Sequence, residues 1–203
     1  MADSELVPTF KLGVLGSGKG SNFVAVAEAC ARGEVAAEVA LVLSDVEEAG
    51  ILSQAERLGV AHRFVSPGDY RTKLDEDAER AYIAALREAE VDLVVLAGFM
   101  RILKGEFLQA FEGRAVNVHP SLLPSFPGLE AWKQALDHGV KYTGVTVHYV
   151  DQGVDSGSII AQEPVPVRDD DTSECLYARI QEVEQVFYPK VIGKILKKLM
   201  SDG

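Results

Sequence analysis

Two polar side chains, Asn117 and His119, stand two residues apart in the apolar run Ala115-Val116-Asn117-Val118-His119. In a β-strand, residues i and i+2 project from the same face, so this amide and this imidazole are predicted to lie side by side. Pro120 has no N–H to donate, and the strand is expected to end before it. In open α/β sheets the carboxyl ends of strands are where ligands bind. The competing interpretation is a turn that begins at Asn117 and a histidine buried in the core.

Asp155 is a third candidate for the same site. It lies in the loop Asp151-Gln152-Gly153-Val154-Asp155-Ser156-Gly157, whose composition ordinary turn chemistry also explains. In the functional interpretation, the loop folds over the sheet edge and brings Asp155 to His119. The carboxylate would then raise the pKa of the imidazole and orient it. An amide and a cationic imidazole that face one point could stabilise an oxyanion.

A covalent nucleophile and a metal are both disfavoured. Ser121 follows His119 closely but stands between two prolines, without the G-x-S-x-G elbow of serine hydrolases. This favours direct attack by one bound substrate on another. The four histidines show no paired ligand spacing. His62, His138 and His148 are interpreted as structural.

A glycine-rich turn, Gly16-Ser17-Gly18-Lys19-Gly20-Ser21-Asn22, follows the first predicted strand and precedes a helix. Bare amides and a helix dipole at such a turn favour an anion, and we expect a phosphate monoester. The turn is neither the dinucleotide fingerprint G-x-G-x-x-G, because position 21 is serine, nor a P-loop. The alternative is a tight turn in which Ser21 or Asn22 caps the helix.

The loop Gly98-Phe99-Met100-Arg101-Ile102-Leu103 is unusually apolar. It could form local core under the next helix, or it could be a wall for a flat aromatic ligand whose edge is read by backbone groups. Arg71 and Arg101 are candidate anion contacts, although single arginines are more often solvated surface residues.

The elements that must position these residues alternate along the first half of the chain. Strands are expected at 10–16, 39–43, 61–65, 91–97 and 115–119, with helices at 23–32, 47–58, 70–90 and up to about 111. Right-handed crossovers then predict an α/β fold with a Rossmann-like, mostly parallel twisted sheet flanked by helices, in which the 91–97 strand is central.

The second half is expected to differ. A short helix is predicted at 129–138, and strands at 142–150 and 158–167 are too close for a parallel crossover, so they should form an antiparallel C-terminal hairpin. Asp171 is predicted to cap a long C-terminal helix at about 173–199. Pro189 is expected to kink or restart that helix.

Composition places the chain among globular proteins. Its 203 residues, 47% hydrophobic and 25% charged, suit one domain, with residues 1–8 a loose tail and no secretory signal. No apolar run approaches the roughly 20 residues that cross a bilayer. Cys30 and Cys175 are interpreted as buried helix residues in a reduced, cytoplasmic setting. A net charge of −11 argues against nucleic acid or an anionic membrane as the main partner.

Four motifs together resemble the family of folate-dependent glycinamide ribonucleotide formyltransferases. They are Gly18-Lys19-Gly20-Ser21-Asn22, Leu96-Ala97-Gly98-Phe99-Met100-Arg101-Ile102-Leu103, Asn117-Val118-His119-Pro120-Ser121-Leu122-Leu123-Pro124 and Val154-Asp155-Ser156-Gly157. The third marks the wider formyltransferase superfamily, whereas the first two are more specific. Lys19 differs from the Asn or Thr frequent in that turn, and its side chain is expected to point away.

The resemblance implies formyl transfer from 10-formyltetrahydrofolate, a co-substrate, to the amine of glycinamide ribonucleotide in purine synthesis, without a metal. It implies a single formyltransferase domain over 1–203, with a nucleotide-binding half at 10–119 and a folate-binding half at 120–203. The partners would be small molecules only, and the protein a monomer or homodimer. By position, it implies a catalytic trio of Asn117, His119 and Asp155. It also implies a phosphate site of Gly20, Ser21 and Asn22 and a ribose contact from Glu184. The implied folate contacts are Arg71, Met100, Arg101, Ile102, Leu103, Asn117, Asp151, Gln152, Gly153, Val154 and Asp155.

Three other functions remain open on the sequence. One is another folate formyltransferase, acting on methionyl-tRNA or a sugar nucleotide, or a formyltetrahydrofolate hydrolase. The tRNA enzyme usually adds a C-terminal barrel and the hydrolase an N-terminal regulatory domain, and this chain is expected to have room for neither. Another is a non-catalytic nucleotide-binding module, which would need the glycine-rich turn but not the trio. A nicotinamide dehydrogenase is disfavoured by the incomplete fingerprint.

Overall fold

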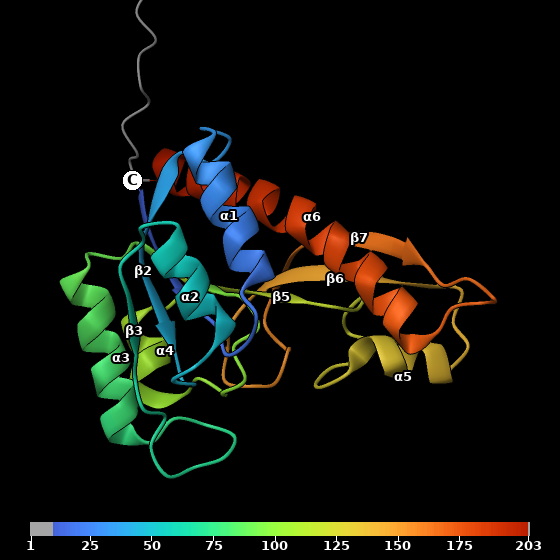
Figure 1. The fold of residues 1–203 in the computed structure, drawn as a ribbon, viewed down its shortest axis with the longest axis horizontal. Helices are drawn as coiled ribbons and strands as arrows, with labels where there is room; N and C mark the ends of the chain where they lie inside the picture. Colours follow the sequence, from blue (N-terminus) through green and yellow to red (C-terminus); the bar gives the residue numbers. More distant parts are fainter. Residues whose placement is uncertain (1–9, 203) are drawn as a thin grey trace, which may run out of the picture.

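A computed structural model describes residues 10–202, so the tail predicted for residues 1–8 lies outside the described residues. Strands and helices alternate through most of this range (Figure 1). In chain order the elements are β1 (Phe10–Leu15), α1 (Ser21–Ala31), β2 (Ala37–Ser44), α2 (Gly50–Arg57), β3 (His62–Phe64), α3 (Glu76–Glu88), β4 (Leu93–Leu96), α4 (Gly105–Ala110), β5 (Ala115–His119), α5 (Ala131–Asp137), β6 (Tyr142–Tyr149), β7 (Ile159–Pro166) and α6 (Ser173–Asp202).

Within residues 10–202 the strands form one seven-stranded sheet in the order β3-β2-β1-β4-β5-β6-β7. The first five strands pair in parallel, whereas β6 pairs antiparallel with both β5 and β7. The predicted fold class is therefore confirmed, including the central position of β4 and the C-terminal hairpin. β5 also ends at His119, directly before Pro120, as expected.

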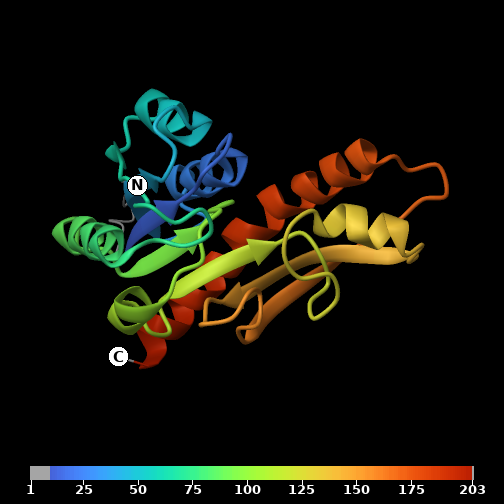
Figure 2. The same ribbon diagram turned by 90° about the horizontal axis from the view of Figure 1, so that it is seen from below.

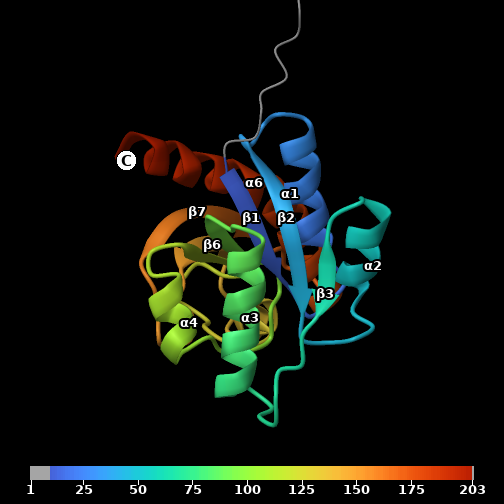
Figure 3. The same ribbon diagram turned by 90° about the vertical axis from the view of Figure 1, so that its left-hand side faces the viewer.

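The two faces of the sheet are buried by different helices. On β4, Leu93 and Val95 join a core cluster with residues of α1, α2 and α6, whereas Val94 and Leu96 join a second cluster with residues of α3 and α4. This alternation follows from the two-residue period of a strand. Figure 3 shows α1 and α2 on one side of the parallel strands and α3 and α4 on the other. The strands buried on both sides read as continuous apolar runs for this reason.

The last helix, α6, differs from the prediction in its N-cap. It continues through Pro189, so the helix does not restart there, and the kink expected as the other outcome stays a prediction. It begins at Ser173, and Asp171 is not its N-cap: the Asp171 carboxylate instead accepts hydrogen bonds from Arg179 at 2.6 and 2.8 Å. The Oγ1 of Thr172 accepts from the N–H of Cys175, which is the capping contact.

Two further predictions are corrected. The helix expected from residue 70 begins at Glu76, because the side chain of Asp75 accepts from the N–H of Ala78 at 2.8 Å and caps it there. The two cysteines are not both buried: Cys175 is exposed and Cys30 is half-buried, where burial raises the pKa of its thiol to about 11. Among the helices of residues 10–202, none is both long and apolar enough to cross a membrane.

α6 runs along the sheet from the α5 end to the side of α1 (Figure 1). In Figure 2, α5 and the first turns of α6 lie together at the end of the molecule opposite α3. The buried hydroxyl of Tyr188 lies 3.0 Å from the carbonyl oxygen of Leu96 on β4 and 3.1 Å from that of Val116 on β5. One side chain of α6 thereby fixes the helix against the two central strands.

We expect Tyr188→Phe to lower the free energy of unfolding by about 1–2 kcal/mol, because it removes the buried donor that both carbonyl groups share. Chemical denaturation would measure the loss, with Tyr142→Phe as the control, since the Tyr142 side chain is largely exposed. Equal effects of the two substitutions would show that the Tyr188 hydroxyl does not hold α6.

Candidate active site

β5 presents Asn117 and His119 on one face, as predicted from their spacing. Val116 and Val118 face the α6 side, where both belong to the core cluster, so the two polar residues between and after them face the other way. His119 is buried. Its Nδ1 lies 3.2 Å from Oδ2 of Asp155, and its Nε2 lies 2.9 Å from the carbonyl oxygen of Phe126. The sequence prediction that Asp155 reaches His119 is confirmed.

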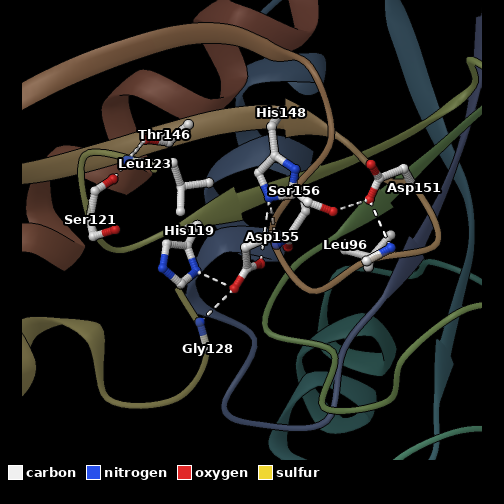
Figure 4. Close-up of polar contacts among 12 residues, drawn as sticks. Leu96, His119, Ser121, Leu123, Gly128, Thr146, His148, Asp151, Asp155 and Ser156 are labelled. Atoms are coloured by element: carbon white, nitrogen blue, oxygen red, sulfur yellow. Dashed lines mark hydrogen bonds and ion pairs between the residues drawn. The ribbon is translucent and has the colours of Figure 1, made fainter. Parts of the chain in front are cut away.

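The loop between β6 and β7 folds back to deliver Asp155 (Figure 4). Within the loop, Asp151 accepts hydrogen bonds from the N–H of Gly153 and the hydroxyl of Ser156, at 3.0 and 2.7 Å. Asp155 itself has a left-handed backbone, with φ of 52°, and Oδ2 accepts from the N–H of Gly128 at 2.8 Å. The carboxylate is therefore held from two sides, by its own loop and by the loop after β5.

The loop after β5 is held by buried polar contacts. The hydroxyl of Ser121 donates to the carbonyl oxygen of Ser125 at 2.6 Å, so it is engaged in the loop and not presented as a nucleophile. The Oγ1 of Thr146 donates to the carbonyl oxygen of Ser121 and accepts from the N–H of Leu123. These bonds tie the loop to β6 and so position the Phe126 carbonyl and the Gly128 amide around His119 and Asp155.

The net direction of the His119 pKa is opposite to the one expected. Burial lowers the pKa of His119, and the neighbouring Asp155 and Phe126 carbonyl oppose that effect without overcoming it. Burial also raises the pKa of Asp155, but His148, the Gly128 amide and His119 outweigh it and the pKa of the carboxyl falls. The surroundings thus favour the ionised form of the Asp155 carboxyl group and the neutral form of the His119 imidazole.

His148, which was interpreted from the sequence as structural, lies in this cluster. It stands directly opposite Asn117 in the β5–β6 pairing, and its ring is buried. Its Nε2 lies 3.3 Å from Nδ2 of Asn117 and 3.6 Å from Oδ1 of Asp155. Figure 4 shows Asp155 between the two histidines. The strand register carries this information, and no spacing rule within the sequence reveals it.

The glycine-rich turn leaves the start of α1 open. Gly20 has φ of 83°, and a Cβ there would meet the Cα of Ile51 at 2.8 Å, so glycine is required. The N-terminus of α1 has no side-chain cap, so the alternative in which Ser21 or Asn22 caps the helix is wrong. Its first amides are thereby available to an anion. Lys19 is exposed.

Glu184 meets this turn from α6. Its Oε2 accepts from Nδ2 of Asn22 at 3.0 Å, across 162 residues of sequence. Glu184 lies one helical turn before Tyr188, so the contact of Tyr188 with β4 and β5 also positions this carboxyl group. Only 6% of Glu184 is exposed, and burial raises its pKa to about 7. The Oδ1 of Asn22 is buried with no hydrogen-bond partner of its own.

The apolar loop after β4 lies partly in the core and partly at the surface. Leu103 is buried in the α3–α4 core, whereas 58% of Met100 is exposed. The Ser17 hydroxyl ties this loop to the glycine-rich turn: it accepts from the N–H of Met100 at 2.8 Å and donates to Asp45 at 2.5 Å. One hydroxyl group therefore links the loop after β4 to the turn after β1.

Arg101 points into the protein. Its Nε donates to Asp45 at 2.7 Å, and its NH1 donates to the carbonyl oxygens of Tyr70 and Arg71. The buried Asp45 and this guanidinium link the loop after β2 to the 70–71 segment, a connection that sequence reasoning missed. Arg71, Gln152, Gly153 and Val154 are exposed, and Ile102 is half-buried. Among residues 10–202, no group of three or more His, Cys, Asp or Glu side chains is arranged to hold a metal.

Comparisons with known proteins agree with this geometry. A sequence model of the family described as formyl transferase matches residues 10–192. Phosphoribosylglycinamide formyltransferase of Bacillus subtilis (strain 168) is 41% identical over 92% of this chain and 94% of that protein. The trifunctional purine biosynthetic protein adenosine-3 of Gallus gallus is 43% identical over 95% of this chain, which spans 19% of that longer protein.

Solved structures show the same similarity. The crystal structure of phosphoribosylglycinamide formyltransferase from Bacillus halodurans matches with a TM-score of 0.88 and 41% identity, over 93% of this chain and 96% of that one. Glycinamide ribonucleotide transformylase 1 from Symbiobacterium toebii matches with a TM-score of 0.86 and 46% identity, over 91% of this chain and 86% of that one.

The buried Glu184 predicts a pH dependence of stability. Its pKa of about 7 in the native protein lies above the ordinary 4.5, so the native state binds more protons between these values. The contribution of Glu184 to the free energy of unfolding is therefore largest below pH 4.5. It is lost as pH rises towards 7, by up to about 3 kcal/mol.

We expect Glu184→Gln to remove this fall, because the amide does not ionise yet keeps an oxygen for Asn22. Urea unfolding at pH 5 and pH 8 would measure it, with Glu182→Gln, an exposed neighbour, as the control. A Glu184→Gln variant that keeps the wild-type pH dependence would show that Glu184 is already ionised in the native protein at pH 5.

Proposed function

The chain belongs to the formyl transferase family, and we propose that its Asn117, His119 and Asp155 transfer a formyl group to the amine of glycinamide ribonucleotide. It is a phosphoribosylglycinamide formyltransferase of purine biosynthesis, and 10-formyltetrahydrofolate is its co-substrate. The observation that carries the catalytic assignment is the contact of His119 with Asp155 beside Asn117, in a buried cluster built by a strand and two loops.

The ribonucleotide binds where the glycine-rich turn meets α6. The uncapped amides of Gly20, Ser21 and Asn22 take the phosphate, as a helix N-terminus does for an anion. Glu184 takes the ribose hydroxyl groups, and its contact with Asn22 supports one continuous site for phosphate and sugar. Residues 10–119 thus form the nucleotide-binding half of a single domain, to which α6 contributes Glu184.

The folate binds to the loops at 100–103 and 151–155. The exposed side chain of Met100 and the half-buried Ile102 supply apolar surface for the flat pterin, and Leu103 supports them from the core. Backbone groups of 151–154 read the polar edge of the pterin. Arg101 acts by ordering the 70–71 segment, and the exposed Arg71 meets the carboxylate end of the folate.

During transfer the substrate amine attacks the formyl carbon and forms the new C–N bond. The formyl oxygen gains negative charge, which an N–H of Asn117 and His119 stabilise. This charge favours the imidazolium form of His119 and so opposes the effect of burial on its pKa. The proton lost by the amine passes to the His119–Asp155 pair and from it to the folate nitrogen, which leaves as the old C–N bond breaks.

The net charge of −11 supports small-molecule substrates over nucleic acid or a membrane surface. We place the enzyme in the cytoplasm, as a monomer or a homodimer.

A formyl-transfer assay with glycinamide ribonucleotide and 10-formyltetrahydrofolate tests the function. We expect one formylated ribonucleotide per folate consumed. Deformylation of the folate by water, with no formylated ribonucleotide, would identify a hydrolase instead. Failure to bind either molecule would indicate a non-catalytic module.

We expect His119→Ala and Asp155→Asn each to lower kcat by at least about 100-fold with small changes in KM, because both residues act on the charge of the transition state. Steady-state kinetics with both substrates would show this. His62→Ala and Asp137→Asn change exposed residues of the same types and should leave kcat unchanged. Near-wild-type turnover of either site variant would refute the catalytic assignment.

A further inference from the structure

We propose that His148 is a positioning residue that fixes the orientation of the Asn117 side-chain amide, so that Asn117 offers an N–H, and not its oxygen, to the formyl oxygen. The inference rests on the proposed function, in which Asn117 stabilises the oxyanion. His148 does not touch the reacting atoms in this role. It acts through Asn117, which it faces across the β5–β6 ladder.

The tautomer of His148 follows from its backbone contact. Its Nδ1 lies 2.8 Å from the carbonyl oxygen of Tyr149. A carbonyl oxygen can only accept, so Nδ1 carries the proton and donates it. In the neutral ring, Nε2 then has a lone pair and can only accept.

This lone pair decides which way the Asn117 amide faces. Nε2 of His148 lies 3.3 Å from Nδ2 of Asn117, so the amide donates one of its two hydrogens to the ring. A flipped amide would place Oδ1 against the lone pair, with two acceptors facing each other and no proton between them. The second hydrogen on Nδ2 remains for a substrate oxygen.

Burial makes the contact selective. Only 2% of His148 is exposed, and Asn117 is half-buried, so water cannot easily replace the lost bond if the amide flips. An unsatisfied buried polar group costs more than a hydrogen bond contributes on average. The contact between Nε2 and Oδ1 of Asp155, at 3.6 Å, is longer than a hydrogen bond, so the Asn117 amide is the nearer partner of that nitrogen.

Two substitutions separate positioning from packing. His148→Leu keeps a buried side chain of similar bulk but removes the acceptor, and we expect kcat to fall about 10- to 100-fold with KM for both substrates changed less than about 3-fold. His148→Gln can place its Oε1 near the former Nε2, and we expect it to recover most of the lost kcat. Equal losses in the two variants would show that the acceptor is not what matters.

A double-mutant cycle tests whether His148 acts through Asn117. We expect His148→Leu to lower kcat by less than about 3-fold in an Asn117→Ala background, because the group it orients is already gone. Full additivity of the two losses would overturn the proposal.

An NMR measurement decides the contact independently of activity. The side-chain amide resonances of Asn117 are assigned by their loss in Asn117→Ala, and we expect His148→Leu, but not His62→Leu, to shift them. Unshifted resonances would overturn the inference even in an active enzyme. Absence of formyl transfer by the wild-type protein would instead refute the proposed function, and the resonances would still report whether His148 holds the amide.

Discussion

β6 pairs antiparallel with β5, and the catalytic geometry depends on this pairing. It sets His148 opposite Asn117 and Thr146 opposite His119. Because a strand alternates its faces, these four side chains share the face away from α6. The same pairing places the start of the 151–157 loop beside β5, from where the loop can fold back to reach His119. Because β6 runs antiparallel, this loop starts beside Ala115 at the beginning of β5, and it must fold back along the strand to bring Asp155 to His119.

The site holds its ionisable groups in environments that pull their pKa values in different directions. The pKa values of His119 and Asp155 both fall, but for different reasons: burial lowers that of His119, and surrounding donors lower that of Asp155. The pKa of Glu184 rises, because the effect of burial outweighs the single hydrogen bond that the carboxyl group accepts from the Asn22 amide. Two carboxyl groups with similar ordinary pKa values are thereby driven apart: Asp155 is held ionised, whereas the pKa of Glu184 rises to about 7.

α6 and one buried ion pair connect the loops that follow the parallel strands. Tyr188 fixes α6 to β4 and β5 and so brings Glu184 to the turn after β1. Asp45 and Arg101 join the loops after β2 and β4 and the 70–71 segment. Both contacts join residues that are far apart in the sequence, and both use carbonyl or carboxylate oxygens as acceptors. The loops that meet the substrates are therefore ordered by groups that do not themselves need to touch them.

The sequence by itself determined the alternating elements, the parallel core, the C-terminal hairpin and the shared face of Asn117 and His119, because these follow from local periodicity, glycine and proline. The motifs also named Asp155, Glu184 and the family. Only the tertiary structure decided that His148 belongs to the site, that Arg101 turns inward, that Asp171 pairs with Arg179, and that burial outweighs Asp155 in the His119 pKa. Each of these depends on strand register or on the exclusion of water, which arise from contacts between distant segments and leave no local pattern in the sequence.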